Sequence, residues 1–254
     1  MTAGRIERRI MRPLAGKSSA PGLRRQKPWL KKDTMCGKFT AMASWADVVA
    51  FSRPLNKPAG DRAVTFRVMN NLPLIVRDRQ SGARRIMAMR WGFPHPSDWK
   101  RPQPIHARAE SIDTTRAFAD AFTSGQRGIV LVKNFNEAPE SGEQHTISPG
   151  DEEALGIAFV WRSFDVGAAS SLLAAVMVTV PANALIARLP TDRMPAILAP
   201  EDWAKWLGEE PASPAELKAC LKSVEGAAWT MTREERAAKA PRTKPVVSNP
   251  RGFF

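Results

Sequence analysis

The residue with the most distinctive chemistry is Cys36, which directly follows Met35. A Cys at the N-terminus of a chain carries an α-amine and a thiol on adjacent carbons. Their pKa values, near ~8 and ~8.5, leave useful fractions of both reactive forms at neutral pH. Together they trap an aldehyde, because the amine forms an imine to which the thiol adds, closing a five-membered thiazolidine ring. An internal Cys cannot do this, since its nitrogen is an amide, so the chemistry requires that the Met35–Cys36 bond be broken.

Residues 1–34 differ in charge from the rest of the chain. They contain ten Lys or Arg and two acidic residues, so they carry +8 of the net charge of +13. Such a basic stretch is typical of a solvated tail. Three interpretations stay open: a true translation start at Met35, a leader that is cleaved, and a retained arm that binds DNA. The charge that remains after residue 34 favours a polyanionic partner.

Composition excludes several classes of protein. No apolar run approaches the ~20 residues of a membrane span, and residues 1–34 lack the apolar stretch of a secretion signal. Two widely separated Cys, Cys36 and Cys220, form no disulfide framework, so a reducing cytosol is expected. The three His and two Cys have no ligand spacing, and no Gly-rich phosphate loop precedes a helix. Neither a metal nor a cofactor is predicted.

The elements that would position the reactive residues follow from local patterns. Apolar runs predict strands at 63–68, 73–78, 84–91, 128–132, 155–161, 172–180 and 194–198. Capping signals and apolar spacing predict short helices at Ser44–Phe51, at Asp113–Phe122, from Pro200 through Leu207, and from Ser213 through Leu221. Proline content predicts irregular loops at 53–62 and 94–104.

This order of strands and short helices predicts a single mixed α+β domain over residues 35–232. Residues 1–34 would be a disordered basic tail or no part of the mature protein, and residues 233–254 an extended, charged C-terminal tail. Cys220 falls on the apolar face of a helix and is expected to be a buried, inert Cys.

Five short segments are distinctive in their order and spacing. They are Met35-Cys36-Gly37, Trp91-Gly92-Phe93, His106-Ala107-Arg108-Ala109-Glu110, Phe135-Asn136-Glu137 and Arg193-Met194-Pro195-Ala196-Ile197-Leu198. As a set they resemble the SRAP family, the SOS response-associated peptidases or abasic-site processing proteins. The resemblance runs from Met35 to about residue 210, and it implies a largely antiparallel, barrel-like sheet flanked by short helices.

The resemblance also implies a substrate and roles for individual residues. The substrate would be single-stranded DNA with an abasic site, whose ring-opened aldehyde Cys36 captures after a self-processing peptidase step. Glu137 would be the catalytic carboxyl group, able to move protons if burial raises its pKa. Arg108 would grip a phosphate beside the lesion with two hydrogen bonds. Arg193 would be a further DNA contact, while Glu110 would pair with an Arg or cap the next segment.

Aromatic residues are the expected stacking surface for bases. Trp91, Phe93 and Trp99 are the candidates, and stacking contributes roughly 1–3 kcal/mol per base. The alternative for Trp91 is that it ends a strand and belongs to the hydrophobic core.

The chain departs from the family pattern at positions that bear on chemistry. His106 replaces an Asn and would either compensate or act as the acid or base itself. Thr191 replaces a His that is believed to assist opening of the deoxyribose ring. Because Thr does not titrate near neutral pH, the reaction is expected to be slowed, altered or lost. Asn136 replaces a Tyr, and the chain contains no Tyr at all.

Three functions stay open on these grounds. The first is a monomeric, cytoplasmic and nucleoid-associated sensor that crosslinks itself to abasic sites and acts in the DNA damage response. The second is a catalytically impaired module that binds single strands in a salt-dependent way. The third is a hydrolase with a non-DNA substrate, in which Cys36 is the nucleophile and His106 the base; this one does not require removal of residues 1–34.

Overall fold

The computed structural model describes residues 38–41, 65–137, 143–149, 154–167, 170–225 and 228–234. All of them belong to one compact unit, Thr34–Phe254. The helix expected at Ser44–Phe51, the loop expected at 53–62 and the residues Met35 and Cys36 lie outside the described part of the chain.

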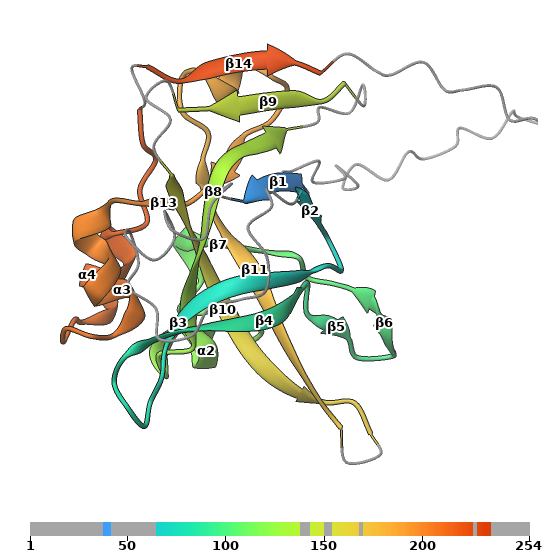
Figure 1. Ribbon diagram of the computed structural model, residues 1–254, viewed down its shortest axis with the longest axis vertical. Helices are drawn as coiled ribbons and strands as arrows, with labels where there is room; N and C mark the ends of the chain where they lie inside the picture. Colours follow the sequence, from blue (N-terminus) through green and yellow to red (C-terminus); the bar gives the residue numbers. More distant parts are fainter. Residues whose placement is uncertain are drawn as a thin grey trace, which may run out of the picture. The chain divides into compact units, whose positions relative to one another are not determined.

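Five strands close into a barrel, as Figure 1 shows. They are β3 (Asn71–Arg77), β4 (Arg84–Trp91), β8 (Arg127–Glu137), β10 (Leu155–Asp165) and β11 (Ser171–Pro181). β3 pairs antiparallel with β4 and β8, β8 with β10, and β10 with β11. A parallel pairing of β11 with β4 completes the ring. The α+β class and the largely antiparallel, barrel-like sheet are therefore confirmed.

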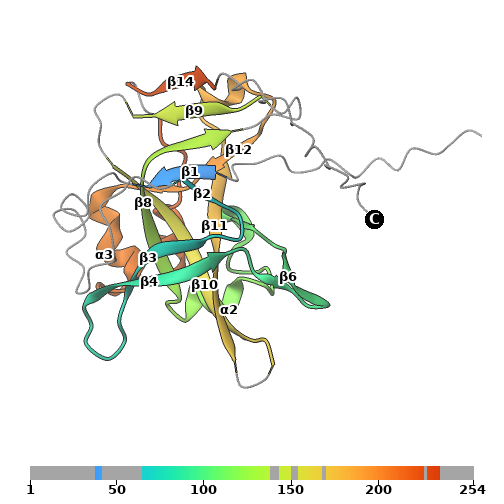
Figure 2. The ribbon, with the colours of Figure 1, turned by 45° about the vertical axis from the view of Figure 1, so that its right-hand side comes forward.

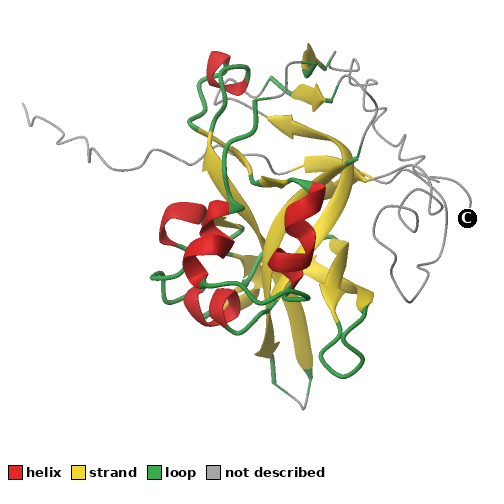
Figure 3. Ribbon diagram, turned by 90° about the vertical axis from the view of Figure 1, so that its left-hand side faces the viewer, coloured by secondary structure: helices red, strands yellow, loops and turns green. Residues whose placement is uncertain are grey.

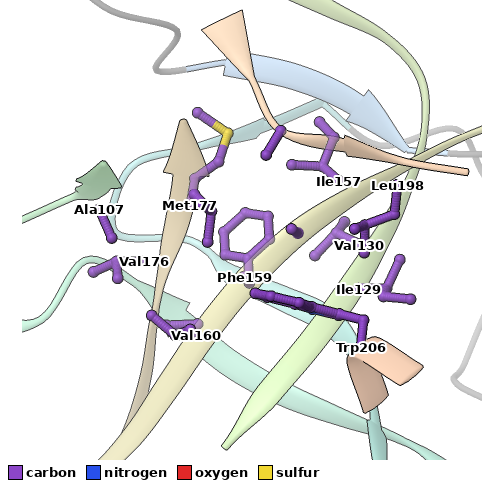
Figure 4. Close-up of a cluster of buried hydrophobic side chains, with 14 of the residues drawn as sticks. Ala107, Ile129, Val130, Ile157, Phe159, Val160, Val176, Met177, Leu198 and Trp206 are labelled. Atoms are coloured by element: carbon purple, nitrogen blue, oxygen red, sulfur yellow. The ribbon is translucent and has the colours of Figure 1, made fainter. Parts of the chain in front are cut away.

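Apolar side chains fill the barrel (Figure 4). Phe159 on β10 lies directly opposite Met177 on β11, and both side chains are fully buried. Val130 and Ile157 form an equivalent buried pair between β8 and β10. Strands whose two faces are both covered read as continuous apolar runs rather than as alternating ones. This is why the central strands were recognisable from sequence.

Gly156 on β10 marks a close approach of helix and sheet. A Cβ atom built at this position would lie 2.8 Å from the ring of Trp203, a distance that real Cβ contacts do not reach. Trp203 is itself buried, and its indole N–H donates to the carbonyl oxygen of Leu198 at 3.2 Å. The ring therefore cannot move away freely.

Gly156→Ala is expected to lower the free energy of unfolding by about 1–3 kcal/mol, because overpacking forces the Trp203 ring or the strand to shift. Chemical denaturation monitored by Trp fluorescence measures this. Ser163→Ala, at an exposed position of the same strand, is the control and should change stability by less than about 0.5 kcal/mol. Equal stability of the two variants would contradict the close packing.

An antiparallel extension of the same sheet grows from the C-terminal half of β8. Its strand order is β2 (Thr65–Arg67), β1 (Lys38–Ala41), β8, β9 (His145–Ser148) and β14 (Thr230–Arg233). Each pairing in this row is antiparallel. β8 thus runs from the barrel into this extension, which explains why it continues beyond the predicted strand at 128–132.

Short strands flank the end of the barrel. β7 (His106–Arg108) runs parallel to β11, and β12 (Arg193–Pro195) runs antiparallel to it. β13 (Ile197–Leu198) pairs with β10. The buried strand predicted at 194–198 is therefore present as two short pieces.

One loop prediction is wrong. Within 94–104, β5 (Pro94–His95) and β6 (Asp98–Pro102) pair as a small antiparallel hairpin rather than forming an irregular loop. Pro94 and Pro102 are paired at the end of this two-stranded sheet. Each strand there is an edge strand, so a Pro that lacks a backbone N–H removes few ladder hydrogen bonds.

The helices are short and lie outside the sheets (Figure 3). They are α2 (Ala119–Thr123), α3 (Trp203–Leu207) and α4 (Pro214–Ala219), with 3-10 turns at Ala109–Ser111, Ile186–Arg188 and Pro200–Asp202. The capping box predicted at Ser213 is confirmed, with Ser213 and Glu216 bonded reciprocally. The helix expected over Asp113–Phe122 is largely wrong, because turns occupy most of that range.

Arg127, at the start of β8, links α3 to the barrel by hydrogen bonds. Its guanidinium donates to the backbone carbonyl oxygens of Trp206 and Phe122, each at 2.5 Å, and lies 5.8 Å from the centre of the Trp206 ring. Burial lowers the pKa of Arg127 to about 10, so the side chain stays charged at neutral pH. A charged group at the core boundary is stabilised here by its two carbonyl partners.

Candidate functional site

Glu137 is the last residue of β8, and its side chain is only 1% exposed. It lies directly opposite His145, the first residue of β9. The His145 side chain is half-buried, and its Nδ1 has no hydrogen-bond partner among the described residues. Directly opposed residues of antiparallel strands share one face of the sheet, with Cβ atoms about 5 Å apart. A carboxyl group and an imidazole therefore share one face at the end of β8.

The ends of β8 and β11 reach the same end of the barrel. Both strands pair antiparallel with β10, so they run in the same direction. Figure 2 shows β1, β9 and β12 together in the upper part of the view, around these strand ends. We call this region, from Glu137 on β8 to Thr179 on β11, the site end of the barrel.

Two of the predicted motifs meet at Thr179. Arg108 on β7 is the partner of Thr179 in the parallel ladder, while Pro195 on β12 is its antiparallel partner. Segments that are some eighty residues apart in sequence thus flank the same stretch of β11. The fold brings together the Ala-Arg-Ala-Glu and Arg-Met-Pro motifs that sequence could only place in order.

Arg193 is buried and holds these motifs together. Its guanidinium donates to both carboxylate oxygens of Glu110, at 2.6 and 2.9 Å, and to the carbonyl oxygen of Thr179 at 2.5 Å. The hydrogen bond from Arg193, above all, lowers the pKa of Glu110. The structural role expected for Glu110 is present. This geometry favours a structural role for Arg193 too, instead of the predicted DNA contact.

Arg108 and His106 differ in exposure. The Arg108 side chain is exposed, whereas that of His106 is half-buried and lies edge-on to Trp91, with ring centres 6.4 Å apart. Of the basic residues predicted to contact DNA, Arg108 is the exposed one and Arg193 the buried one.

Thr191 lies at the turn that leads into β12. Its hydroxyl donates to the carbonyl oxygen of Arg193 at 3.3 Å, and its backbone N–H donates to Leu189 at 2.7 Å. The side chain is half-buried. Thr191 shapes this turn and, as its chemistry dictates, offers no group that titrates near neutral pH.

Trp91 and Phe93 belong to the core. They are 0% and 2% exposed, and the indole N–H of Trp91 donates to the carbonyl oxygen of Ile105 at 3.2 Å. Phe93 packs against Phe164 and Phe118, with ring centres 5.0 and 6.1 Å apart. The structure favours the core alternative for Trp91, and burial excludes base stacking by either ring in this conformation. The structure does not describe the side chain of Trp99.

A polar cluster at the start of β1 was not anticipated. Glu234, the residue after β14, accepts hydrogen bonds from Lys38 on β1, Asn136 on β8 and Thr146 on β9. Lys38 and Glu234 are 196 residues apart in sequence. The one signal in the sequence was the departure at Asn136, whose amide makes contacts that the family's Tyr could not make in the same way.

The chain matches the family model for SOS response associated peptidase (SRAP) over residues 35–238. It belongs to the SRAP family.

Two relatives from Bacillus subtilis support this assignment. The chain is 23% identical over 198 residues to abasic site processing protein YoqW of Bacillus subtilis, an alignment that covers 74% of this chain and 87% of YoqW. It is 24% identical over 195 residues to abasic site processing protein YobE of the same organism, with 74% and 88% covered.

Solved structures share the fold. A protein of Bacteroides thetaiotaomicron superposes with a TM-score of 0.68 at 19% identity, covering 79% of this SRAP chain and 92% of that protein. A protein of Bordetella bronchiseptica gives 0.67 at 18% identity, with 79% and 100% covered. The barrel is therefore the SRAP-like fold.

The described residues contain no group of three or more His, Cys, Asp or Glu side chains that could hold a metal ion. Within the same part of this SRAP protein, no helix has the length and apolar character needed to cross a bilayer.

Proposed function

We propose that the SRAP chain, once it begins at Cys36, captures the ring-opened aldehyde of an abasic site in single-stranded DNA. The α-amine of Cys36 attacks the aldehyde carbon and forms an imine with release of one water. The thiol then adds to the imine carbon, and its proton passes to the nitrogen, which closes the thiazolidine. The product is a covalent protein–DNA crosslink, in keeping with relatives named as abasic site processing proteins.

The observation that carries this proposal is the position of Glu137 beside the strand that follows Cys36. Lys38 lies opposite Asn136, the neighbour of Glu137. Each residue spans at most about 3.6 Å, so the Cα atom of Cys36 is within about 7 Å of the Cα atom of Lys38. Covalent geometry therefore limits how far Cys36 can lie from the end of β8, where the buried Glu137 carboxyl group could exchange protons with the amine and the imine.

The remaining roles follow from exposure and charge. Arg108 holds the phosphate next to the lesion, since its exposed guanidinium suits bidentate contact with phosphate oxygens. His106 assists proton transfer, because one imidazole nitrogen can accept a proton while the other donates one. A self-processing peptidase step, or translation from Met35 with loss of the Met, supplies the free amine. The protein acts as a monomer in the cytoplasm, where single-stranded DNA arises during damage.

A second function is favoured by one observation at Thr191. Its hydroxyl is engaged with the backbone of Arg193 at the position where the family has a His. Without that imidazole, the SRAP fold would bind single strands but react slowly or not at all. This alternative predicts binding that is equal for intact and abasic DNA.

The test compares the full-length chain with one that starts at Met35, each incubated with a single-stranded oligonucleotide carrying one abasic site. We expect a band that resists denaturation from the Met35 chain and none from its Cys36→Ala variant. A band from both lengths indicates self-processing. Binding without a band from either chain would overturn covalent capture in favour of the binding module.

A further inference from the structure

We propose that Glu234 is a positioning residue that clamps the start of β1, and thereby holds Cys36 in place for the reaction proposed above. The inference rests on that proposed function. It adds a residue beyond the predicted domain end at 232, in the segment where sequence indicated an extended tail.

The contacts of Glu234 join four strands at one carboxylate. Oε1 accepts hydrogen bonds from Lys38 Nζ at 2.8 Å, Asn136 Nδ2 at 2.6 Å and Thr146 Oγ1 at 3.0 Å. Oε2 accepts a second bond from Lys38 Nζ at 3.0 Å. The backbone N–H of Glu234 donates to Gln144 at 2.8 Å, which continues the ladder between β14 and β9. The carboxylate is therefore fixed by its own strand before it holds β1.

This cluster is partly shielded from water. The side chains of Lys38 and Glu234 are 19% and 35% exposed, and Asn136 is 3% exposed. An exposed ion pair contributes little, but a charged pair that shares two further hydrogen bonds in a half-buried setting restrains its strands more firmly. The hydrogen bond from Lys38 is the largest cause of the lowered pKa of Glu234. The carboxylate is thus charged at neutral pH, and the clamp weakens only in acid.

Lys38 is the residue through which the clamp acts on Cys36. It is the first described residue of β1 and lies two residues after Cys36. A ring closure that needs amine, thiol, aldehyde and a proton-transferring carboxyl group together depends strongly on how well these groups are held. Without the clamp, the start of β1 loses both hydrogen bonds from Lys38 to the Glu234 carboxylate, and the aligned fraction of Cys36 falls.

The contact between Asn136 and Glu234 depends on a residue that departs from the family pattern. The residue replaces a Tyr of the family pattern, and its amide nitrogen donates to Glu234 as well as to Thr146 Oγ1 at 2.8 Å. Asn136 sits between Glu137 and Phe135 on β8 and so points to the opposite face of the strand from Glu137. The clamp therefore lies on the face of β8 opposite the Glu137 side chain, on the same face as its partner Lys38.

The test measures single-turnover crosslinking by the chain that begins at Cys36, at increasing concentrations of abasic oligonucleotide. In Glu234→Gln, the maximal rate is expected to fall about tenfold, while the half-saturating DNA concentration changes less than about twofold. Lys38→Gln should give the same loss, and the double variant no more than either alone, because both changes remove one interaction. Additive losses, an unchanged rate, or a change in half-saturation alone would overturn the clamp.

Glu143→Gln is the matched control. Glu143 also forms an ion pair at the β9–β14 edge, but its partner is Arg233 on β14, whereas the partner of Glu234 is Lys38 on β1. Hydrogen exchange at the β1 amides gives a readout that needs no activity. It should accelerate about tenfold in Glu234→Gln and not in Glu143→Gln, and equal exchange in the two variants would refute the clamp. If the wild-type chain forms no crosslink, but β1 exchanges faster in Glu234→Gln than in Glu143→Gln, the proposed function is refuted while the clamp is supported.

Discussion

Glu137→Gln is expected to slow crosslinking to abasic DNA by about 100-fold. Glu137 is 1% exposed at the end of β8, beside the strand that follows Cys36. A Gln of the same shape fills the space but cannot accept and return a proton, and positioned acid–base groups contribute typically 10²–10⁴-fold. The measurement is the single-turnover rate of crosslink formation at saturating DNA.

The control for this prediction is Glu201→Gln, on the exposed 3-10 turn Pro200–Asp202. It should crosslink at the wild-type rate. If Glu137→Gln also reacts at that rate while remaining folded, the buried carboxyl group takes no part in proton transfer, and the assignment of the site end would have to change.

Arg193→Met is expected to destabilise the fold by about 2–3 kcal/mol. The guanidinium bonds Glu110 twice and also the carbonyl oxygen of Thr179. Its loss leaves a buried acceptor without its donor, while the half-exposed Glu110 regains water. For a chain of this size the midpoint of thermal unfolding should fall by about 5–10 °C. Differential scanning calorimetry measures this.

A matched control separates the structural role of Arg193 from a DNA contact. Arg188→Met removes an exposed Arg from the nearby turn Ile186–Arg188 and should leave the melting midpoint within about 2 °C. Should Arg193→Met instead keep its stability and lose DNA affinity, Arg193 would be a phosphate contact as the family resemblance suggested.

The fold was largely predictable because its strands are long and apolar. Runs such as 128–132 and 172–180 are buried on both faces and match β8 and β11. The hairpin at 94–102 was missed because its prolines argue against strands, although the ends of a small two-stranded sheet tolerate them. The helix over Asp113–Phe122 failed for another reason. A single helical turn is enough to place Phe118 and Phe122 on the same side, and the N–H of Phe122 donates to the carbonyl oxygen of Phe118 at 2.9 Å. The spacing of the two Phe residues therefore does not require a longer helix.

The site was only partly predictable. Sequence motifs place Glu137, Arg108 and Arg193 in order, but a residue type does not disclose whether its side chain faces solvent or the interior. Trp91 and Arg193 both turn out to be buried. The contact of Glu234 with Lys38 joins residues 196 positions apart, and no local pattern reports such a pairing. The same holds for His145 opposite Glu137, which depends on the register of β8 and β9.

The most direct test of covalent capture is the mass of the crosslinked peptide. The chain started at Met35 is incubated with an abasic oligonucleotide without a reducing agent, then digested with protease and nuclease and analysed by tandem mass spectrometry. Our account predicts a peptide that begins at Cys36, with both its α-amine and its thiol joined to the deoxyribose remnant. An adduct on a Lys side chain, or one in which the thiol of Cys36 remains free to alkylate, would contradict it.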